Sequence, residues 1–239
     1  TIARGDVVLA PELHAPAERI DATVAMLATE AKPLTQWMPV RLHHAATEVG
    51  ARIVLLGDAP VPPGGRAMVQ LVLERPVAAA AGDRFVLRDT TAQRTIGGGR
   101  FLDLRAPARK RRTPERMAQL EALALPDPEA ALAALLGRAP GYIDIATFIR
   151  DHALSEAERA SLVERLSLIR LQTAKAEFAL LPAVWLRLKN RMTAVLEAFH
   201  ADYPNLAGMG FERLRLQLEP RLPAPAFAAM LQGLARSRD

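Results

Sequence analysis

The first hundred residues alternate between apolar and polar side chains at the two-residue period of half-buried β-strands. Strict alternation covers 20–26 and part of 39–43, and apolar or β-branched runs follow at 49–56, 68–77, 85–88 and 95–104. Glycine and proline turns, such as Gly57-Asp58 and the stretch 62–65, separate these runs. Short strands joined in this way predict an antiparallel β-barrel over residues 16–105.

The pattern changes at a basic, proline-flanked segment, which predicts a linker over residues 106–113. Thr113-Pro114 then has the form of a helix start, and the helical period continues over 114–123, 127–137, 144–152 and 155–167. Apolar pieces at 168–173 and 177–181 predict a two-stranded hairpin. Three helices followed by a hairpin are the order of a winged helix, so residues 114–182 are predicted to form one, with helix 114–123 as its lead-in.

Helical patterns at 184–199, 211–218 and 226–234 predict a second winged helix over residues 183–239. The sequence ends where its wing would begin, so we expect this unit to be truncated. Residues 1–10 lack a starting Met and have the pattern of a last strand without a partner. We therefore expect an excised fragment in which residues 1–15 end a preceding barrel domain. The predicted fold class is multidomain β plus α, a barrel followed by tandem winged helices.

Composition narrows the function classes only slightly. The net charge is +5, with Arg far outnumbering Lys, which favours polyanionic partners and RNA first. A GC-rich genome would produce the same excess of Arg, so charge alone does not decide. The sequence has no cysteine and no apolar run near the roughly 18 residues that cross a bilayer. These features fit a cytoplasmic protein without a membrane partner.

The motifs that suggest chemistry have structural explanations. His43 and His44 are adjacent on a predicted strand and point to opposite faces, so we expect no metal site, with one histidine packed in the barrel and the other exposed. The run 97–99 consists of glycines without the Gly-Lys-Ser/Thr ending of a phosphate loop, and it indicates close backbone approach or a bulge. No nucleophile elbow or catalytic carboxylate pair is recognisable. We predict no catalytic residue and no enzyme activity.

Several motifs together resemble one protein family. In the barrel they are Arg4–Val8, Trp37–His43, Glu48–Arg52, Leu73–Val77, Gly82–Asp89 and Arg94–Gly98; in the tail they are Phe199–Asn205, Gly208-Met209 and Glu212–Arg215. The sequence is similar to the bacterial selenocysteine-specific elongation factors of the SelB type. Their barrel corresponds to the third domain of elongation factor Tu, and tandem winged helices follow it.

The resemblance implies a parent GTPase that brings selenocysteyl-tRNA to a ribosome paused at UGA, guided by an mRNA hairpin. GTP and Mg would belong to a domain missing here, so no cofactor is expected in this fragment. The implied partners are selenocysteine tRNA, the ribosome and, through later domains, the mRNA hairpin.

The third domain of such GTPases grips the T stem of tRNA, which suggests where RNA would bind. The resemblance places this contact at the hairpin tip and its flanks, that is, at Arg41, Arg52, Arg88, Thr90, Thr91, Gln93 and Arg94. The basic linker offers further phosphate contacts through Arg109, Lys110, Arg111 and Arg112. The alternative is that both segments are ordinary solvated turns.

Two other functions remain open at this point. The chain could be a non-catalytic spacer or docking module, in which the barrel only holds its GTPase domain. It could also be a DNA-binding winged-helix regulator. The expected third helix, 155–167, argues against the regulator because Glu156, Glu158 and Glu164 outnumber Arg159 and Arg165.

Overall fold

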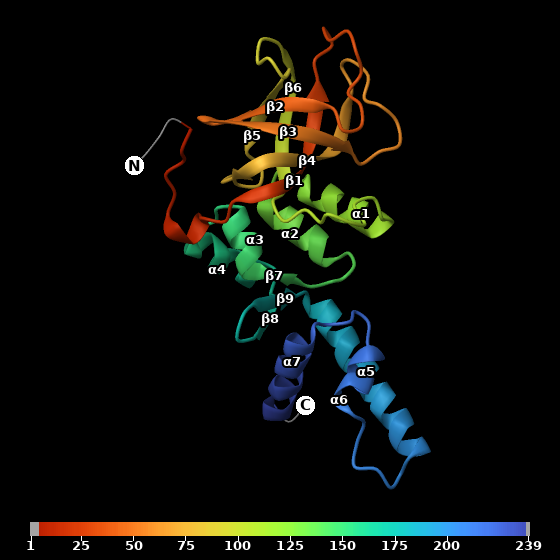
Figure 1. The fold of residues 1–239 in the computed structure, drawn as a ribbon. Helices are drawn as coiled ribbons and strands as arrows, with labels where there is room; N and C mark the ends of the chain where they lie inside the picture. Colours follow the sequence, from red (N-terminus) through yellow and green to blue (C-terminus); the bar gives the residue numbers. More distant parts are fainter. Residues whose placement is uncertain (1–4, 238–239) are drawn as a thin grey trace. The chain divides into compact units, whose positions relative to one another are not determined.

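A computed structural model describes residues 5–237 of the chain (Figure 1). The chain divides into two compact units. The first contains the chain up to Ala131 together with Arg150–Leu154, and the second contains Leu132–Ile149 and the chain from Ser155 onward. The first unit thus extends past residue 113, where the sequence predicts the end of a linker.

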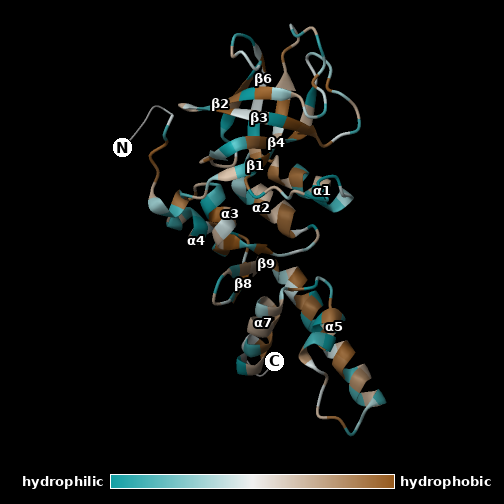
Figure 2. Ribbon diagram, viewed as in Figure 1, coloured by the Kyte–Doolittle hydropathy of each residue, from teal (hydrophilic) through white to brown (hydrophobic). Residues whose placement is uncertain are grey.

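The first unit is built on a closed antiparallel barrel of six strands, as the hydrophobic pattern predicts. In spatial order the strands are β1 (Ala17–Met26), β4 (Arg66–Val77), β3 (Thr47–Leu55), β2 (Pro39–His44), β5 (Arg84–Arg88) and β6 (Thr95–Asp103). Hydrophobic and hydrophilic residues alternate along them (Figure 2). The inward residues, among them Ile20, Leu42, Ile53 and Phe101, are fully buried and form the barrel core.

The glycine run in β6 marks close backbone approach, as expected. A Cβ atom on Gly99 would lie 1.7 Å from the carbonyl oxygen of Thr23, and one on Gly97 would lie 2.4 Å from that of Ala25. Both neighbours belong to β1, which pairs with β6 to close the barrel. Side chains at these two positions would separate the closing strands.

Helix α1 (Pro114–Leu123) packs on the outside of the barrel, rather than serving only as a lead-in to the winged helix. Leu120 is fully buried against Leu56 and Leu102. The Thr113 hydroxyl accepts a hydrogen bond from the Arg116 N–H at 3.2 Å, so the predicted cap is present. The apolar face of α1 is the physical reason that the first unit extends past the expected linker.

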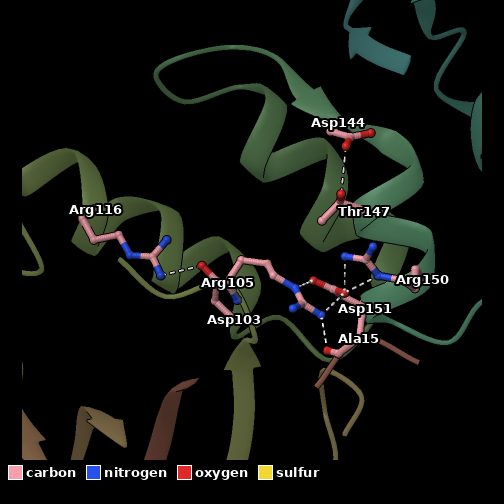
Figure 3. Close-up of polar contacts among 8 residues, drawn as sticks. All are labelled: Ala15, Asp103, Arg105, Arg116, Asp144, Thr147, Arg150 and Asp151. Atoms are coloured by element: carbon pink, nitrogen blue, oxygen red, sulfur yellow. Dashed lines mark hydrogen bonds and ion pairs between the residues drawn. The ribbon is translucent and has the colours of Figure 1, made fainter. Parts of the chain in front are cut away.

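Arg105 is also held by contacts within the first unit (Figure 3). Its Nε and Nη2 atoms donate to the two carboxylate oxygens of Asp151, at 2.9 and 3.0 Å, and Nη2 also donates to the Ala15 carbonyl at 2.6 Å. Asp151 ends helix α3 (Ile145–Asp151), and its side chain is only 10% exposed. The residue that directly precedes the predicted linker is therefore anchored, not freely solvated.

The winged-helix elements have the predicted order, with one strand added. They are α2 (Pro128–Leu136), β7 (Ile143–Asp144), α3, α4 (Glu156–Arg165), β8 (Ile169–Gln172) and β9 (Glu177–Leu180). The three strands form a sheet in the order β7-β9-β8. The predicted capping box of α4 is present, with reciprocal hydrogen bonds between Ser155 and Glu158. β7 has only two residues, which is too short to produce a periodic pattern.

The remaining helices are α5 (Pro182–Asp202), α6 (Phe211–Leu216) and α7 (Ala224–Ser237), close to the predicted ranges. Their core contains Leu188, Phe227 and Met230, together with Leu171 and Leu180 from the β8–β9 hairpin. The second helical set therefore packs on the wing of the first, and the two share one core. None of the described helices is both long and apolar enough to cross a membrane.

The strand expected at the start of the chain is not present in the part that the structure describes. Residues 5–10 have no regular secondary structure, and a short 3-10 helix, η1 (Pro11–Leu13), follows them. The Thr47 hydroxyl donates to the Gly5 carbonyl at 2.7 Å, but no strand pairs with this segment among the described residues. The other residues of that prediction, 1–4, lie outside the described range.

Candidate nucleic-acid interface

Asp89 organises the tip of the β5–β6 hairpin. Its Oδ1 atom accepts hydrogen bonds from the N–H groups of Gln93 and Arg94, at 2.9 and 3.1 Å, and its Oδ2 atom accepts one from the Thr91 hydroxyl at 3.0 Å. These donors lower the pKa of Asp89, the Arg94 N–H contributing most. A charged carboxylate thus fixes the turn that presents the candidate RNA contacts.

Four predicted contact residues are exposed at this tip: Thr90, Thr91, Gln93 and Arg94. Arg94 also has a structural contact that the sequence does not reveal. Its Nη1 atom lies 3.3 Å from Oε2 of Glu30, whose side chain is only 4% exposed. Arg94 therefore neutralises a buried carboxylate, besides presenting its own half-exposed guanidinium to solvent.

The other three predicted residues lie together on the outer face of the barrel. Arg41 on β2 and Arg88 on β5 are direct cross-strand partners, and Arg52 on β3 pairs with Pro39, two residues from Arg41. Like charges directly opposite one another destabilise a sheet. The carboxylate of Glu48 approaches Arg41 only to 3.8 Å, with both side chains partly exposed. The Nε atom of Arg88 is buried and has no hydrogen-bond partner among the described residues.

The two histidines point to opposite faces, as their positions on a strand predict. His44 is buried, its Nε2 atom lies 2.9 Å from Oδ2 of Asp83, and its ring centroid is 5.3 Å from that of Phe101. The hydrogen bond with His44 is the main cause of the lowered pKa of Asp83. His43 is half-buried, not exposed as predicted, and shares the outer face with Arg41. Within residues 5–237, no three metal-ligating side chains of the His, Cys, Asp and Glu types gather.

Comparison with known proteins identifies the family to which this barrel and the C-terminal helices belong. The profile of the selenocysteine-specific elongation factor β-barrel domain matches residues 18–108, and that of the elongation factor SelB winged helix matches residues 193–238. The chain is 32% identical over its whole length to the selenocysteine-specific elongation factor of Escherichia coli strain K12. This chain is part of a selenocysteine-specific elongation factor.

Two further relatives, both selenocysteine-specific elongation factors, agree with this assignment. The selenocysteine-specific elongation factor of Haemophilus influenzae is 29% identical over 73% of the chain, and that of Desulfomicrobium baculatum is 29% identical over 42%. The chain spans 36% of the Escherichia coli relative and 25% of the Haemophilus one. The matched domains are the SelB barrel and winged helix, and neither profile describes a GTPase domain.

The four basic residues of the linker lie just beyond the part matched to the SelB barrel and differ in their surroundings; they are Arg109, Lys110, Arg111 and Arg112. Arg112 donates from Nε and Nη2 to the Leu55 carbonyl, at 3.1 and 2.6 Å. The guanidinium carbon of Arg111 lies 5.9 Å from the ring centroid of Trp37. Arg109 and Lys110 are exposed, and neither contacts a carboxylate in the described part of the chain. Two residues thus anchor the segment, and two remain available to an anion.

A buried polar network on the SelB barrel was not foreseen from the sequence. Nε2 of Gln70 donates to Oδ1 of Asp21 at 2.9 Å and to the Pro107 carbonyl at 3.0 Å, while Nη2 of Arg116 donates to Asp21 and Asp103. Burial raises the pKa of Asp21 despite these donors. Burial alone would lower the pKa of Arg116, but the two carboxylates outweigh it and the pKa is raised. This network joins α1 to the barrel.

Proposed function

We propose that this chain is the RNA-holding part of a selenocysteine-specific elongation factor. In this proposal the barrel contacts selenocysteine tRNA through the hairpin tip and the adjacent arginine face. The winged helices connect the barrel towards the end of the factor that binds the mRNA hairpin. The parent protein acts as a cytoplasmic GTPase on the ribosome, with GTP and Mg bound outside this chain.

The opposed pair Arg41 and Arg88 is the observation that carries the proposal. Two cations directly across a sheet cost stability unless an anion lies close to both. Glu48 pairs with Arg41 at 3.8 Å and the carboxylate of Glu74 lies over Gly50, opposite Arg41, whereas Arg88 has no ion pair in the described part of the chain. An RNA backbone supplies phosphates to such a face without requiring contacts to base edges, because helical RNA is read largely by shape and by phosphate and 2′-hydroxyl contacts.

The winged-helix elements do not favour DNA as the ligand. Arg159 on α4 donates to Glu156 on the same helix at 3.0 Å, and it also bonds the buried Glu177 on β9. Arg170 on β8 pairs with the same Glu177 at 3.1 Å. A helix that enters a major groove needs free cationic side chains, and here an internal carboxylate engages Arg159 of α4.

The proposal is tested by titrating the chain with selenocysteine tRNA, an elongator tRNA and a DNA duplex at two salt concentrations. Arg41→Gln and Arg88→Gln should each weaken tRNA binding by about 1.5–3 kcal/mol, the range for losing a hydrogen bond to a charged group. Each should also reduce the salt dependence by about one phosphate's share. The matched control is Arg66→Gln, since Arg66 is exposed at the start of β4 and away from this face.

Each outcome separates the candidate functions. Equal losses for Arg41, Arg88 and Arg66 would indicate non-specific attraction by net charge and would contradict a defined face. Tight binding to the DNA duplex would support the regulator. If none of the three nucleic acids binds, the chain acts as a spacer, a role that the bonds of Arg105 to Asp151 and of Arg112 to Leu55 would suit.

A further inference from the structure

Two stretches of the first unit that are far apart in the sequence both hydrogen-bond to Leu55, the last residue of β3. The N–H of Leu55 donates to Oε1 of Gln36 at 2.7 Å, and the carbonyl of Leu55 accepts two hydrogen bonds from Arg112. The residues that follow Gln36 and precede Arg112 are Trp37 and Arg111. The shared anchor therefore holds the indole and the guanidinium side by side, 5.9 Å apart.

Trp37 is an unusual residue to find on this surface. It is 46% exposed, whereas large aromatic side chains generally contribute to cores. Its φ is +62°, in the left-handed region that bulky residues rarely adopt, and a hydrogen bond from its N–H to the Ile53 carbonyl at 2.7 Å keeps it there. A strained backbone that displays an indole to solvent is typical of a binding position.

The surroundings of Trp37 are strongly cationic. A groove lined by Gln36, Val54 and residues 108–113 lies here. Arg109 and Lys110 on its rim are exposed and contact no carboxylate in the described part of the chain. The nearby carboxylate of Asp58 is fully exposed and lies 3.7 Å from Nη1 of Arg112. It forms no ion pair with Arg109 or Lys110 in the described part of the chain, so both remain available to an anion.

We propose that Trp37 and Arg111 form a stacking platform for an unpaired RNA base, with Arg109 and Lys110 binding the adjacent phosphates. Aromatic rings and guanidinium planes stack well on bases, and a cationic groove follows a single-stranded backbone. The platform binds an unpaired base, whereas Arg41 and Arg88 are proposed to bind the backbone of helical RNA. It therefore goes beyond that proposal and can be tested independently of it.

The test uses the fact that the chain has two tryptophans. In a Trp185→Phe variant the fluorescence comes from Trp37 alone. We expect unstructured oligouridine and oligoadenosine to quench this emission saturably, and a blunt RNA duplex or inorganic polyphosphate to quench it several-fold less. In anisotropy titrations with labelled oligoadenosine, Trp37→Asn should raise the Kd about tenfold, since one stacked base contributes roughly that factor. Asn tolerates a positive φ, so this variant should fold.

Controls separate stacking from simple charge attraction. Arg109→Gln and Lys110→Gln should lower the salt dependence of oligoadenosine binding, while Arg66→Gln should not. The proposal is overturned if Trp37→Asn binds oligoadenosine like the parent, or if polyphosphate or an acidic peptide quenches Trp37 as strongly as RNA does. Arg41→Gln should leave the quenching unchanged, so failure of the tRNA face and failure of this platform would be distinguishable.

Discussion

At the scale of single residues, burial changes the role of several charged side chains that the sequence presents as equivalent surface groups. Arg94 is half-exposed, but its partner Glu30 is almost completely buried. Arg88, by contrast, has no ion-pair partner among the described residues, and Arg41 approaches the half-exposed Glu48 only to 3.8 Å. The sequence could not separate structural arginines from available ones, because a partner such as Glu30 lies far from its arginine in the chain.

Arg94→Ala should therefore destabilise the barrel, although the substituted side chain is exposed. It leaves the carboxylate of Glu30 buried without its cation, and an unsatisfied buried charged group costs about 1–3 kcal/mol or more. Urea denaturation measures the loss. Adding Glu30→Gln should restore part of the stability because it removes the uncompensated charge. Additive losses in the double variant would show that the two residues do not interact.

The turn at the hairpin tip should depend on pH through Asp89. Its pKa is lowered in the folded chain, so the hydrogen bonds it accepts are present above the ordinary carboxyl range and are lost as the pH falls through the lowered value. The amide signals of Gln93 and Arg94 should shift together in an NMR titration with a midpoint below about 3.9, the usual value for Asp. Asp89→Asn should abolish that transition. A midpoint at or above the usual value would contradict this role.

At the scale of elements, the local pattern predicted the six barrel strands and most helices, because each has a clear period and turn residues at its ends. It did not predict that α1 packs on the barrel. Asp21 and Gln70 occupy polar positions of their strands, which ordinarily face solvent, and only the arrival of Arg116 from a distant helix makes them buried. Such a network depends on tertiary contacts, and no periodicity reveals it.

The glycines of β6 provide a prediction at this scale. Gly99→Ala would place its Cβ 1.7 Å from a backbone oxygen of β1, which cannot move aside like the end of a flexible side chain. We expect destabilisation at or above the top of the range of about 1–3 kcal/mol that overpacking ordinarily costs. Gly57→Ala is the matched control, since no atom lies within 4 Å of its added Cβ, and it should change stability by only about 0.5 kcal/mol. Similar losses in both variants, measured by thermal unfolding, would refute close packing at β6.

At the scale of the whole molecule, the described residues of each unit form hydrophobic clusters of their own. The barrel core and the smaller cluster under α1 consist of residues of the first unit, while the core formed by the β8–β9 hairpin and helices α5–α7 consists of residues of the second. Hydrophobic stabilisation acts through the side chains that pack together. Each unit therefore has its own source of stability.

We accordingly expect the two units to unfold in separate transitions. Leu71 and Leu188 are both fully buried, one in each core, so Leu71→Ala and Leu188→Ala should each cost their own unit about 2–5 kcal/mol. The two tryptophans report the units individually: Trp185→Phe leaves Trp37 in the first, and Trp37→Phe leaves Trp185 in the second. In urea, Leu71→Ala should shift only the transition seen by Trp37, and Leu188→Ala only that seen by Trp185. If either substitution moves both transitions equally, the chain unfolds as one cooperative body and the separate cores do not act independently.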